Sequence, residues 1–276
     1  SLVGSEMCIR DRQWAAKNTP DVWCMQEVRA PQNEIDPIFD EFGFEYATAG
    51  RIADQSGLDR MNEICRIKGR AGVGLLSALP VIDKRYGLPG LAEDVDSGRW
   101  IEADVKTPQG YTVTVVCVYV HAGNTDDPEK MKQKYRFLDT MLVRMGQLRD
   151  EAAHGGKQAV LCGDFNIAHT PLDIKNAKAN EKHAGFLPEE RAYVDKWLGE
   201  LEFVDVMRSL CGDIQGPYTW WSQRGRAFDN NVGWRIDYQF ATPELAETAR
   251  GFVIDKAPTY DLRWSDHAPL SITYDV

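Results

Sequence analysis

Residues 163–166 read Gly-Asp-Phe-Asn and follow directly on the apolar run Ala159-Val-Leu-Cys162. This order predicts a buried strand that ends by presenting Asp164 and Asn166 on one side of its tip. A carboxylate next to an amide can hold a water molecule and a metal-bound phosphate. The pair therefore suggests phosphodiester hydrolysis, and it predicts that further carboxylates and a histidine complete the site.

Other polar groups also stand at the ends of apolar runs, where a sheet can display side chains into a shared cleft. They are Gln26 and Glu27; Tyr119 and His121; and Asp237 with Ser265, Asp266 and His267. Each has an ordinary structural reading: Glu27 as a strand end, Tyr119 as core, Asp237 as an ion-pair partner of Arg235, His267 as a structural histidine. Together they favour a metal site, because carboxylates that face one site repel unless a cation is present.

The pattern along the chain predicts the elements that position these groups. Strands are expected at residues 22–27, 42–47, 72–77, 99–105, 112–120, 158–166, 234–241, 251–254 and 269–274, and helices at 13–18, 127–153 and 188–198. Residues 50–70 are expected to be a polar, irregular insertion. Because strands outnumber helices and often follow one another directly, we predict an α+β fold: a four-layer α/β-sandwich of two packed mixed β-sheets flanked by helices.

The bulk properties are those of a soluble globular protein. The chain has 276 residues, of which 43% are hydrophobic, and its longest apolar run is too short to span a membrane. Six cysteines without CxxC spacing predict reduced thiols, as opposed to disulfides or a zinc site. We therefore expect a cytoplasmic monomer with no membrane partner.

The net charge of −10 argues by itself against a nucleic-acid-binding protein. A site that concentrates carboxylates around a divalent cation reverses the local field, however. Arg224, Arg226 and Arg235 also cluster in the sequence. The overall charge therefore does not exclude a nucleic-acid substrate.

The chain shows no linker rich in Gly, Pro or Ser, so residues 13–276 are predicted to form a single domain. Residues 1–12 differ from the rest, because they have neither a clear apolar period nor the features of a signal peptide. We interpret them as a non-native segment similar to translated adaptor sequence.

Several segments of residues 13–276 together resemble the exonuclease III family of abasic-site endonucleases, within the endonuclease/exonuclease/phosphatase superfamily. They are Pro20-Asp-Val-Trp-Cys-Met-Gln-Glu27, Gly72-Val-Gly-Leu-Leu-Ser77, Ser97-Gly-Arg-Trp100, Leu161-Cys-Gly-Asp-Phe-Asn-Ile-Ala-His169, Asp173-Ile-Lys-Asn176, Ala184-Gly-Phe-Leu-Pro-Glu-Glu-Arg191, Asn231-Val-Gly-Trp-Arg-Ile-Asp-Tyr238 and Ser265-Asp-His267. The Glu27, Gly-Asp-x-Asn and Ser-Asp-His motifs are shared across the superfamily. The segment 231–238 and the Ala-His and Asp-Ile-Lys-Asn segments are much more specific to the DNA-repair branch.

The resemblance implies a metal centre and a water-activating group. Glu27 would ligate Mg²⁺, or Mn²⁺, with Asp266 near a second or alternative metal position; hard oxygen ligands suit these ions. Asp164 would activate the attacking water or protonate the leaving oxygen. Asn166 would orient water and phosphate.

The remaining implied roles concern the phosphate and the DNA. His267 would hydrogen-bond a non-bridging phosphate oxygen, Asp237 would fix the tautomer of His267, and Tyr119 would lie near the phosphate. Such enzymes take a nucleotide out of the stack before cutting. The positions that match the pocket for a flipped-out abasic sugar are Trp220, Trp234 and Ile236, and those that match phosphate or groove contacts are Arg226, Asn231 and Arg235.

The chain departs from the family at two places. The family begins with a strand whose Asn-x-Asn-type segment supports the metal site, and residues 1–12 stand in its place without such an asparagine. We therefore expect this strand to be missing and metal binding to be weakened. After Tyr119-Val120 the family often has Pro and an amide residue, whereas this chain has His121-Ala122. His121 either replaces a phosphate contact or is simply exposed.

The function implied is a Mg²⁺-dependent DNA repair nuclease. It would hydrolyse phosphodiesters 5′ to abasic sites and remove nucleotides or blocking groups from the 3′ ends of double-stranded DNA. Two alternatives stay open: a phosphodiesterase of another branch that acts on RNA, lipid or inositol phosphates, and a non-catalytic nucleic-acid-binding regulator on the same scaffold.

Overall fold

The computed structural model describes residues 14, 17–29, 37, 40–41, 59–63, 71–91 and 98–276. They form two compact units. The first holds the described residues up to Leu88 and from Gly98 to Tyr119, with Val276; the second holds Pro89–Leu91 and Val120–Asp275. The predictions for residues 1–12 and 42–47, the missing first strand among them, lie outside the described residues. The single domain over residues 13–276 stays a prediction.

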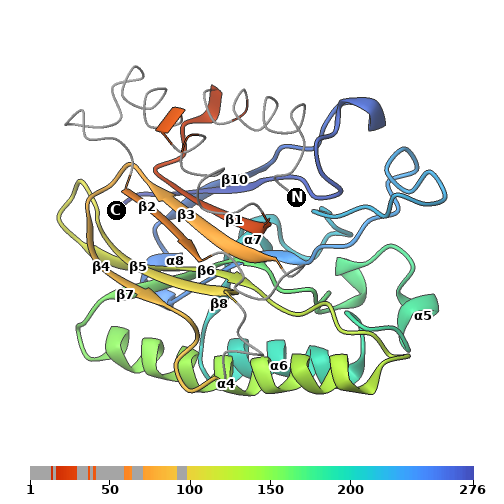
Figure 1. Ribbon diagram of the computed structural model, residues 1–276, viewed down its shortest axis with the longest axis horizontal. Helices are drawn as coiled ribbons and strands as arrows, with labels where there is room; N and C mark the ends of the chain where they lie inside the picture. The colour runs from red at the N-terminus through yellow and green to blue at the C-terminus, as the bar shows by residue number, and fades with distance from the viewer. Residues whose placement is uncertain are drawn as a thin grey trace. The chain divides into compact units, whose positions relative to one another are not determined.

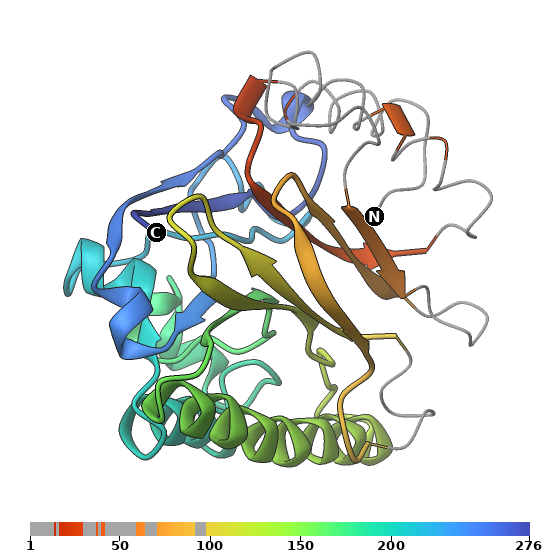
Figure 2. The ribbon, with the colours of Figure 1, turned by 90° about the vertical axis from the view of Figure 1, so that its left-hand side faces the viewer.

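The strands described in the first unit form two antiparallel sheets. In one sheet β1 (Val22–Val28), β3 (Gly72–Ser77) and β2 (Asp59–Glu63) pair in the order β1-β3-β2 (Figure 2). In the other, β4 (Val81–Tyr86), β5 (Trp100–Lys106) and β6 (Thr112–Tyr119) form a meander. β3 contacts β5 and β6, and β1 also contacts β6. The continuous burial of β3 and most of β6 follows from their apolar runs, which are typical of strands covered on both faces.

Two of these strands differ from the sequence-based expectation. β2 lies inside the segment 50–70 that we expected to be irregular, and β4 was not expected at all. β4 carries the polar run Asp83-Lys84-Arg85, which hides its strand character. The strand is stabilised across the ladder, where Arg85 pairs with the buried carboxylates of Glu102 (2.8 Å) and Asp104 (2.8 Å) on β5.

The second unit is built on a long helix and a three-stranded antiparallel sheet. Helix α4 (Pro128–Ala153) lies where the sequence predicts a helix. It begins after Asp127, whose side chain accepts the Lys130 amide, and it has Pro128 at its first position. α4 packs against β7 (Gln158–Asp164) and against α6 (Pro188–Gly199), which runs beside it in Figure 1. β7 pairs with β9 (Asp237–Ala241), and β9 pairs with β8 (Val204–Asp205).

Shorter elements complete the second unit. They are η1 (Pro171–Asp173), α5 (Ala177–Asn180), α7 (Val206–Cys211), α8 (Pro243–Ala246), β10 (Ala249–Ile254), η2 (Tyr260–Leu262) and β11 (Leu270–Tyr274). β10 and β11 form a separate two-stranded antiparallel sheet. The described helices and strands together give the α+β character that the sequence predicts. None of the described helices is both long and apolar enough to cross a membrane.

Strand β9 starts three residues later than predicted. Trp234 forms isolated bridges with Trp220 and Ile174, and the amide of Arg235 donates to the carbonyl of Asp173. The backbone groups of Trp234 and Arg235 therefore pair with loop residues, and the regular ladder with β7 begins only at Asp237. The described cysteines, Cys24, Cys117, Cys162 and Cys211, are free thiols, as expected.

An aromatic cluster anchors the end of β7. Phe165 is fully buried between the two polar residues of the Gly-Asp-Phe-Asn motif, and its ring contacts those of Trp197, Tyr238 and Phe240 at centroid distances of 5.7, 5.7 and 4.9 Å. Ring pairs at this spacing add to the free energy that burial supplies. Phe165 thus fixes the segment from which Asp164 and Asn166 extend.

We expect Phe165→Ala to lower the free energy of unfolding by about 3–5 kcal/mol, because it leaves a cavity in this cluster. Urea denaturation measures the change. Tyr111→Ala, at a side chain that is 61% exposed, is the control and should change it by no more than about 0.5 kcal/mol. Equal stability of the two variants would show that the cluster does not anchor β7.

Candidate active site

Glu27 lies at an irregularity of β1 in the first unit. Its backbone φ is +58°, and the register between β1 and β3 shifts between Met25 and Val28. A bulge of this kind re-aims a side chain. A left-handed conformation costs a residue other than glycine on the order of 1–3 kcal/mol and persists only where the surroundings enforce it. The fold therefore holds this carboxylate in a direction that a regular strand would not give it.

Tyr119 lies next to Glu27. Its hydroxyl donates to Glu27 Oε1 at 2.6 Å, and Arg29 pairs with Oε2 at 3.1 Å. The guanidinium of Arg99 lies 4.4 Å from the centre of the Tyr119 ring and donates to the Tyr119 carbonyl at 3.2 Å. Arg99 was given no role by the sequence analysis, although it lies in the Ser-Gly-Arg-Trp segment that carries part of the family resemblance.

In the second unit, Asp164 and Asn166 form a closed hydrogen-bonded pair. The Asn166 backbone amide donates to Asp164 Oδ1 (2.8 Å), and Asn166 Nδ2 donates both to Asp164 Oδ2 (3.0 Å) and to the Val120 carbonyl (2.9 Å). Asn166 has a φ of +51°, which turns its side chain back toward Asp164. Both Nδ2 protons are used, so Oδ1 of Asn166 is left to act as an acceptor.

His267 connects Asp164 with Asp237. Asp164 stands opposite Asp237 on the paired strands β7 and β9. The Nδ1 atom of His267 lies 2.9 Å from Asp237 Oδ2, and its Nε2 atom lies 3.9 Å from Asp164 Oδ2. Burial lowers the pKa of His267, but the charges of Asp237, Asp164 and Asp266 and the hydrogen bond to Asp237 outweigh it and raise the pKa to about 10. The raised pKa favours the protonated ring, with Nδ1–H bound to Asp237.

Asp266 and the two tryptophans form a second group in this unit. Trp220 Nε1 donates to Asp266 Oδ2 at 3.1 Å. The rings of Trp220 and Trp234 are both partly exposed and nearly perpendicular, with centroids 6.0 Å apart. Both pack on a core cluster that includes Ile236, which is only 5% exposed. The two tryptophan rings thus lie together on Ile236, and their role as a sugar pocket stays a prediction.

Asn231 and Arg226 lie on exposed loop positions. Asn231 Oδ1 accepts from Trp221 Nε1 (3.0 Å) and from Lys256 Nζ (3.0 Å). This orients the amide so that its Nδ2 donors remain for an acceptor such as a phosphate oxygen. The Arg226 side chain is 80% exposed and pairs with Asp229 at 3.3 Å. Both positions suit the predicted DNA contacts.

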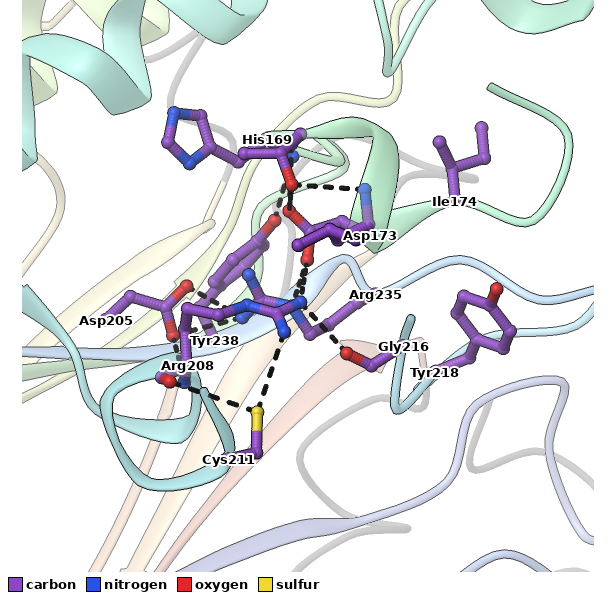
Figure 3. A network of polar contacts seen from close by, with 12 residues as sticks. His169, Asp173, Ile174, Asp205, Arg208, Cys211, Gly216, Tyr218, Arg235 and Tyr238 are labelled. Atoms are coloured by element: carbon purple, nitrogen blue, oxygen red, sulfur yellow. Dashed lines mark hydrogen bonds and ion pairs between the residues drawn. The ribbon is translucent and has the colours of Figure 1, made fainter. Parts of the chain in front are cut away.

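The prediction for Arg235 is wrong. Arg235 is fully buried, and its guanidinium pairs with Asp173 (2.6 Å) and Asp205 (2.7 Å) and lies over the ring of Tyr238 (Figure 3). Arg208 joins the same network through Asp173 (2.5 Å). A guanidinium enclosed in this way cannot reach DNA. Arg235 is also not the partner of Asp237, because its carboxylate partners come from η1 and β8.

His121 is neither exposed nor placed as a surface contact. It is 8% exposed, and its ring packs edge-on against Phe137 of α4 at a centroid distance of 5.6 Å. The residue that replaces the usual proline of the family therefore serves the core of the second unit. No local pattern predicts this contact, because it depends on how α4 packs.

The possible metal ligands are single carboxylates. Among the described residues, no group of three or more His, Cys, Asp or Glu side chains forms a ready-made metal site. Mg²⁺ keeps several waters and is usually held by one or two carboxylates together with substrate phosphate oxygens. Glu27, whose side chain is 34% exposed, and Asp266 therefore fit the ion by ligand type.

We expect Asp237→Asn to lower the pKa of His267 from about 10 toward its ordinary value, because the substitution removes the main opposing charge. A raised pKa stabilises the folded protein fully below about pH 6.5, and this contribution is lost as the pH rises through about 10. NMR titration of the His267 ring, assigned by its absence in His267→Gln, measures the change. A midpoint that stays near 10 would contradict the assigned role of Asp237.

We expect Arg235→Met to lower the free energy of unfolding by about 3–5 kcal/mol, because it leaves the buried carboxylates of Asp173 and Asp205 without their main counter-charge. Urea denaturation measures the loss. Arg226→Met, at an exposed arginine of the same segment, is the matched control and should stay within about 0.5 kcal/mol. Unchanged stability with weakened DNA binding in Arg235→Met would restore the original expectation.

Comparison with known proteins places the whole arrangement in one family. The sequence matches the Endonuclease/Exonuclease/phosphatase family over residues 10–267. It is 28% identical over 256 residues to an exodeoxyribonuclease of Bacillus subtilis (strain 168), a match that covers 93% of this chain and 88% of the relative.

Solved structures show the same fold. An AP endonuclease from Archaeoglobus fulgidus aligns with a TM-score of 0.77 and 29% identity over 96% of this chain and 93% of its own. A 3′ phosphatase from Neisseria bound to a product DNA hairpin aligns with a TM-score of 0.79 and 25% identity over 99% and 95%. The predicted α+β fold class is therefore confirmed, and the family is of a metal-dependent nuclease type. Because the match spans nearly the whole sequence, the chain belongs to the endonuclease/exonuclease/phosphatase family.

Proposed function

We propose that this protein is a DNA repair nuclease that uses Mg²⁺, or Mn²⁺, to hydrolyse phosphodiesters 5′ to abasic sites and to remove nucleotides or blocking groups from the 3′ ends of duplex DNA. The observation that carries the proposal is the row Asp237, His267 and Asp164, in which the imidazole ring stands beside a carboxylate paired with Asn166. The relatives support it, because their names are exodeoxyribonuclease and AP endonuclease.

Asp164 serves as the base in this proposal. Its two oxygens accept from the Asn166 amide and from Asn166 Nδ2, and the His267 imidazolium is close. An ionised Asp164 can take a proton from water, and Asn166 Oδ1 can accept the second hydrogen of that water and so orient it. The arrangement thus favours water activation over protonation of the leaving oxygen.

His267 stabilises the phosphate. Asp237 holds Nδ1–H, so Nε2–H can donate to a non-bridging oxygen on which charge develops during the reaction. Tyr119, held by Glu27 and Arg99, supplies a further hydroxyl for the phosphate. A positioned donor of this kind is worth about a hundred- to a thousand-fold in rate.

Glu27 would hold the divalent cation, and Asp266 would hold a second or alternative one. When bound, the cation would neutralise charge on the phosphate oxygens. The indole of Trp220 already donates to Asp266, so the same carboxylate links the ion position to the tryptophan pair.

The tryptophan pair is the proposed specificity element. Trp220 and Trp234 offer two perpendicular apolar faces to a nucleotide that has left the stack. Arg226 and Asn231 offer donors to DNA phosphates on neighbouring loops. These groups favour DNA over a lipid or inositol phosphate.

We further propose that the protein acts as a cytoplasmic monomer.

The test is cleavage of a duplex that bears a single abasic-site analogue. We expect incision with Mg²⁺, none with EDTA, and a loss of at least about a hundred-fold in Asp164→Asn. Asp126→Asn, which makes the same change at an exposed carboxylate, is the control and should cleave like the parent.

Three outcomes would oppose the proposal. Binding of the duplex without incision would favour the non-catalytic regulator. Hydrolysis of RNA or of an inositol phosphate in preference to the duplex would favour another branch of the superfamily. Full activity of Asp164→Asn would reject the base assigned here.

A further inference from the structure

A fully buried ion pair joins helices α4 and α6. The Nζ atom of Lys134 lies 2.6 Å from Glu190 Oε1, and both side chains are 0% exposed. Replacing a buried ion pair with apolar groups is often neutral or stabilising, so such a pair is weak evidence of stabilisation. A charged pair in this position calls for another explanation, and its hydrogen bonds supply one.

Lys134 reaches the backbone of the Gly-Asp-Phe-Asn loop. Besides Glu190, its Nζ atom donates to the carbonyls of Asn166 (2.9 Å) and Ala122 (3.1 Å). Two carbonyl acceptors and the Glu190 carboxylate surround the Nζ atom, and they suit a charged ammonium, although burial lowers the pKa of Lys134. The carbonyl of Asn166 is thereby held while its φ of +51° keeps its amide on Asp164.

Glu190 holds the other side of the same loop. Its Oε2 atom accepts from the amides of Gly185 (2.6 Å) and Leu187 (3.0 Å). The Gly185 carbonyl in turn accepts from the amide of Ala168 (2.8 Å), two residues after Asn166. A Cβ atom at Gly185 would lie 3.2 Å from the Asn166 carbonyl oxygen, so this backbone lies directly against the loop.

We propose that Lys134 and Glu190 are a positioning pair that clamps residues 166–168 from two sides and so fixes the amide that orients the attacking water. Neither residue touches substrate. The clamp acts on the loop only through backbone groups, which explains why a lysine with three donors and a carboxylate with two acceptor oxygens stand here. The proposal rests on the proposed function for its catalytic consequence, and on the hydrogen bonds alone for its structural one.

The first experiment needs no activity. We would compare amide hydrogen exchange in the parent and in Lys134→Met/Glu190→Gln, a double variant that leaves no unpaired buried charge. We expect faster exchange at Asn166 and Ala168 and unchanged exchange in β9. Met141→Ala, at a buried position of the same helix, is the stability-matched control and should not speed exchange at residues 166–168 selectively.

The second experiment is steady-state cleavage of the abasic-analogue duplex. We expect the double variant to lose about a hundred-fold in kcat with KM changed by less than about threefold, because a water-orienting group is displaced while binding groups stay in place. The single variant Lys134→Arg, which keeps the charge and the donors, should retain most of the parent's kcat. Lys132→Met, at an exposed lysine of α4, should behave like the parent.

The outcomes separate the two proposals. A parent protein that cleaves no duplex would reject the proposed function and leave the exchange experiment as the test of the clamp. A double variant with parental exchange at residues 166–168 would overturn the clamp. So would a Met141→Ala variant that loses as much kcat as the double variant at equal melting temperature.

Discussion

Asp164 and Asp237 stand opposite each other on the antiparallel strands β7 and β9, and this pairing of like charges shapes the second unit. Two carboxylates at such positions destabilise a sheet unless a positive group lies between them. His267 supplies that group, and the two charges are the reason that its pKa is raised. The same contact that offsets the repulsion places an N–H donor beside the carboxylate of the Gly-Asp-Phe-Asn motif. The stability of the sheet end and the position of a donor for the phosphate therefore both depend on His267.

The loops around this pair are held by buried charges. Arg235 links η1 to β8 through Asp173 and Asp205, and Lys134 with Glu190 links α4 and α6 to residues 166–168. Loops carry backbone groups that no strand ladder satisfies, and a buried loop must find partners for them. Charged side chains that donate to or accept from several backbone groups at once meet this need. Their ion pairs and the hydrogen bonds of Lys134 to backbone carbonyls offset part of the cost of burying them.

Two residues to which we assign a role in the reaction have a left-handed backbone conformation. Glu27 and Asn166 both have positive φ, and each directs its side chain at a neighbour, Tyr119 in the first unit and Asp164 in the second. Neither is glycine, so each conformation is maintained against a local preference by the surrounding contacts. For Asn166, one such contact is the hydrogen bond that Lys134 Nζ donates to its carbonyl. Strain of this kind is invisible in a sequence, because it depends on what the backbone packs against.

The sequence by itself determined the secondary structure of most strands and of both long helices, because apolar period and capping residues are local signals. It also determined the family and the residue types of the site, since Glu27, Asp164, Asn166, Asp237 and His267 lie in short motifs at strand ends. The tertiary structure decided which of these polar groups pair. Arg235, His121 and Lys134 are all polar residues whose partners lie on other elements, and burial turned the first from an expected DNA contact into a structural cation. Burial and pairing depend on contacts between distant residues, and these exist only once the chain has folded.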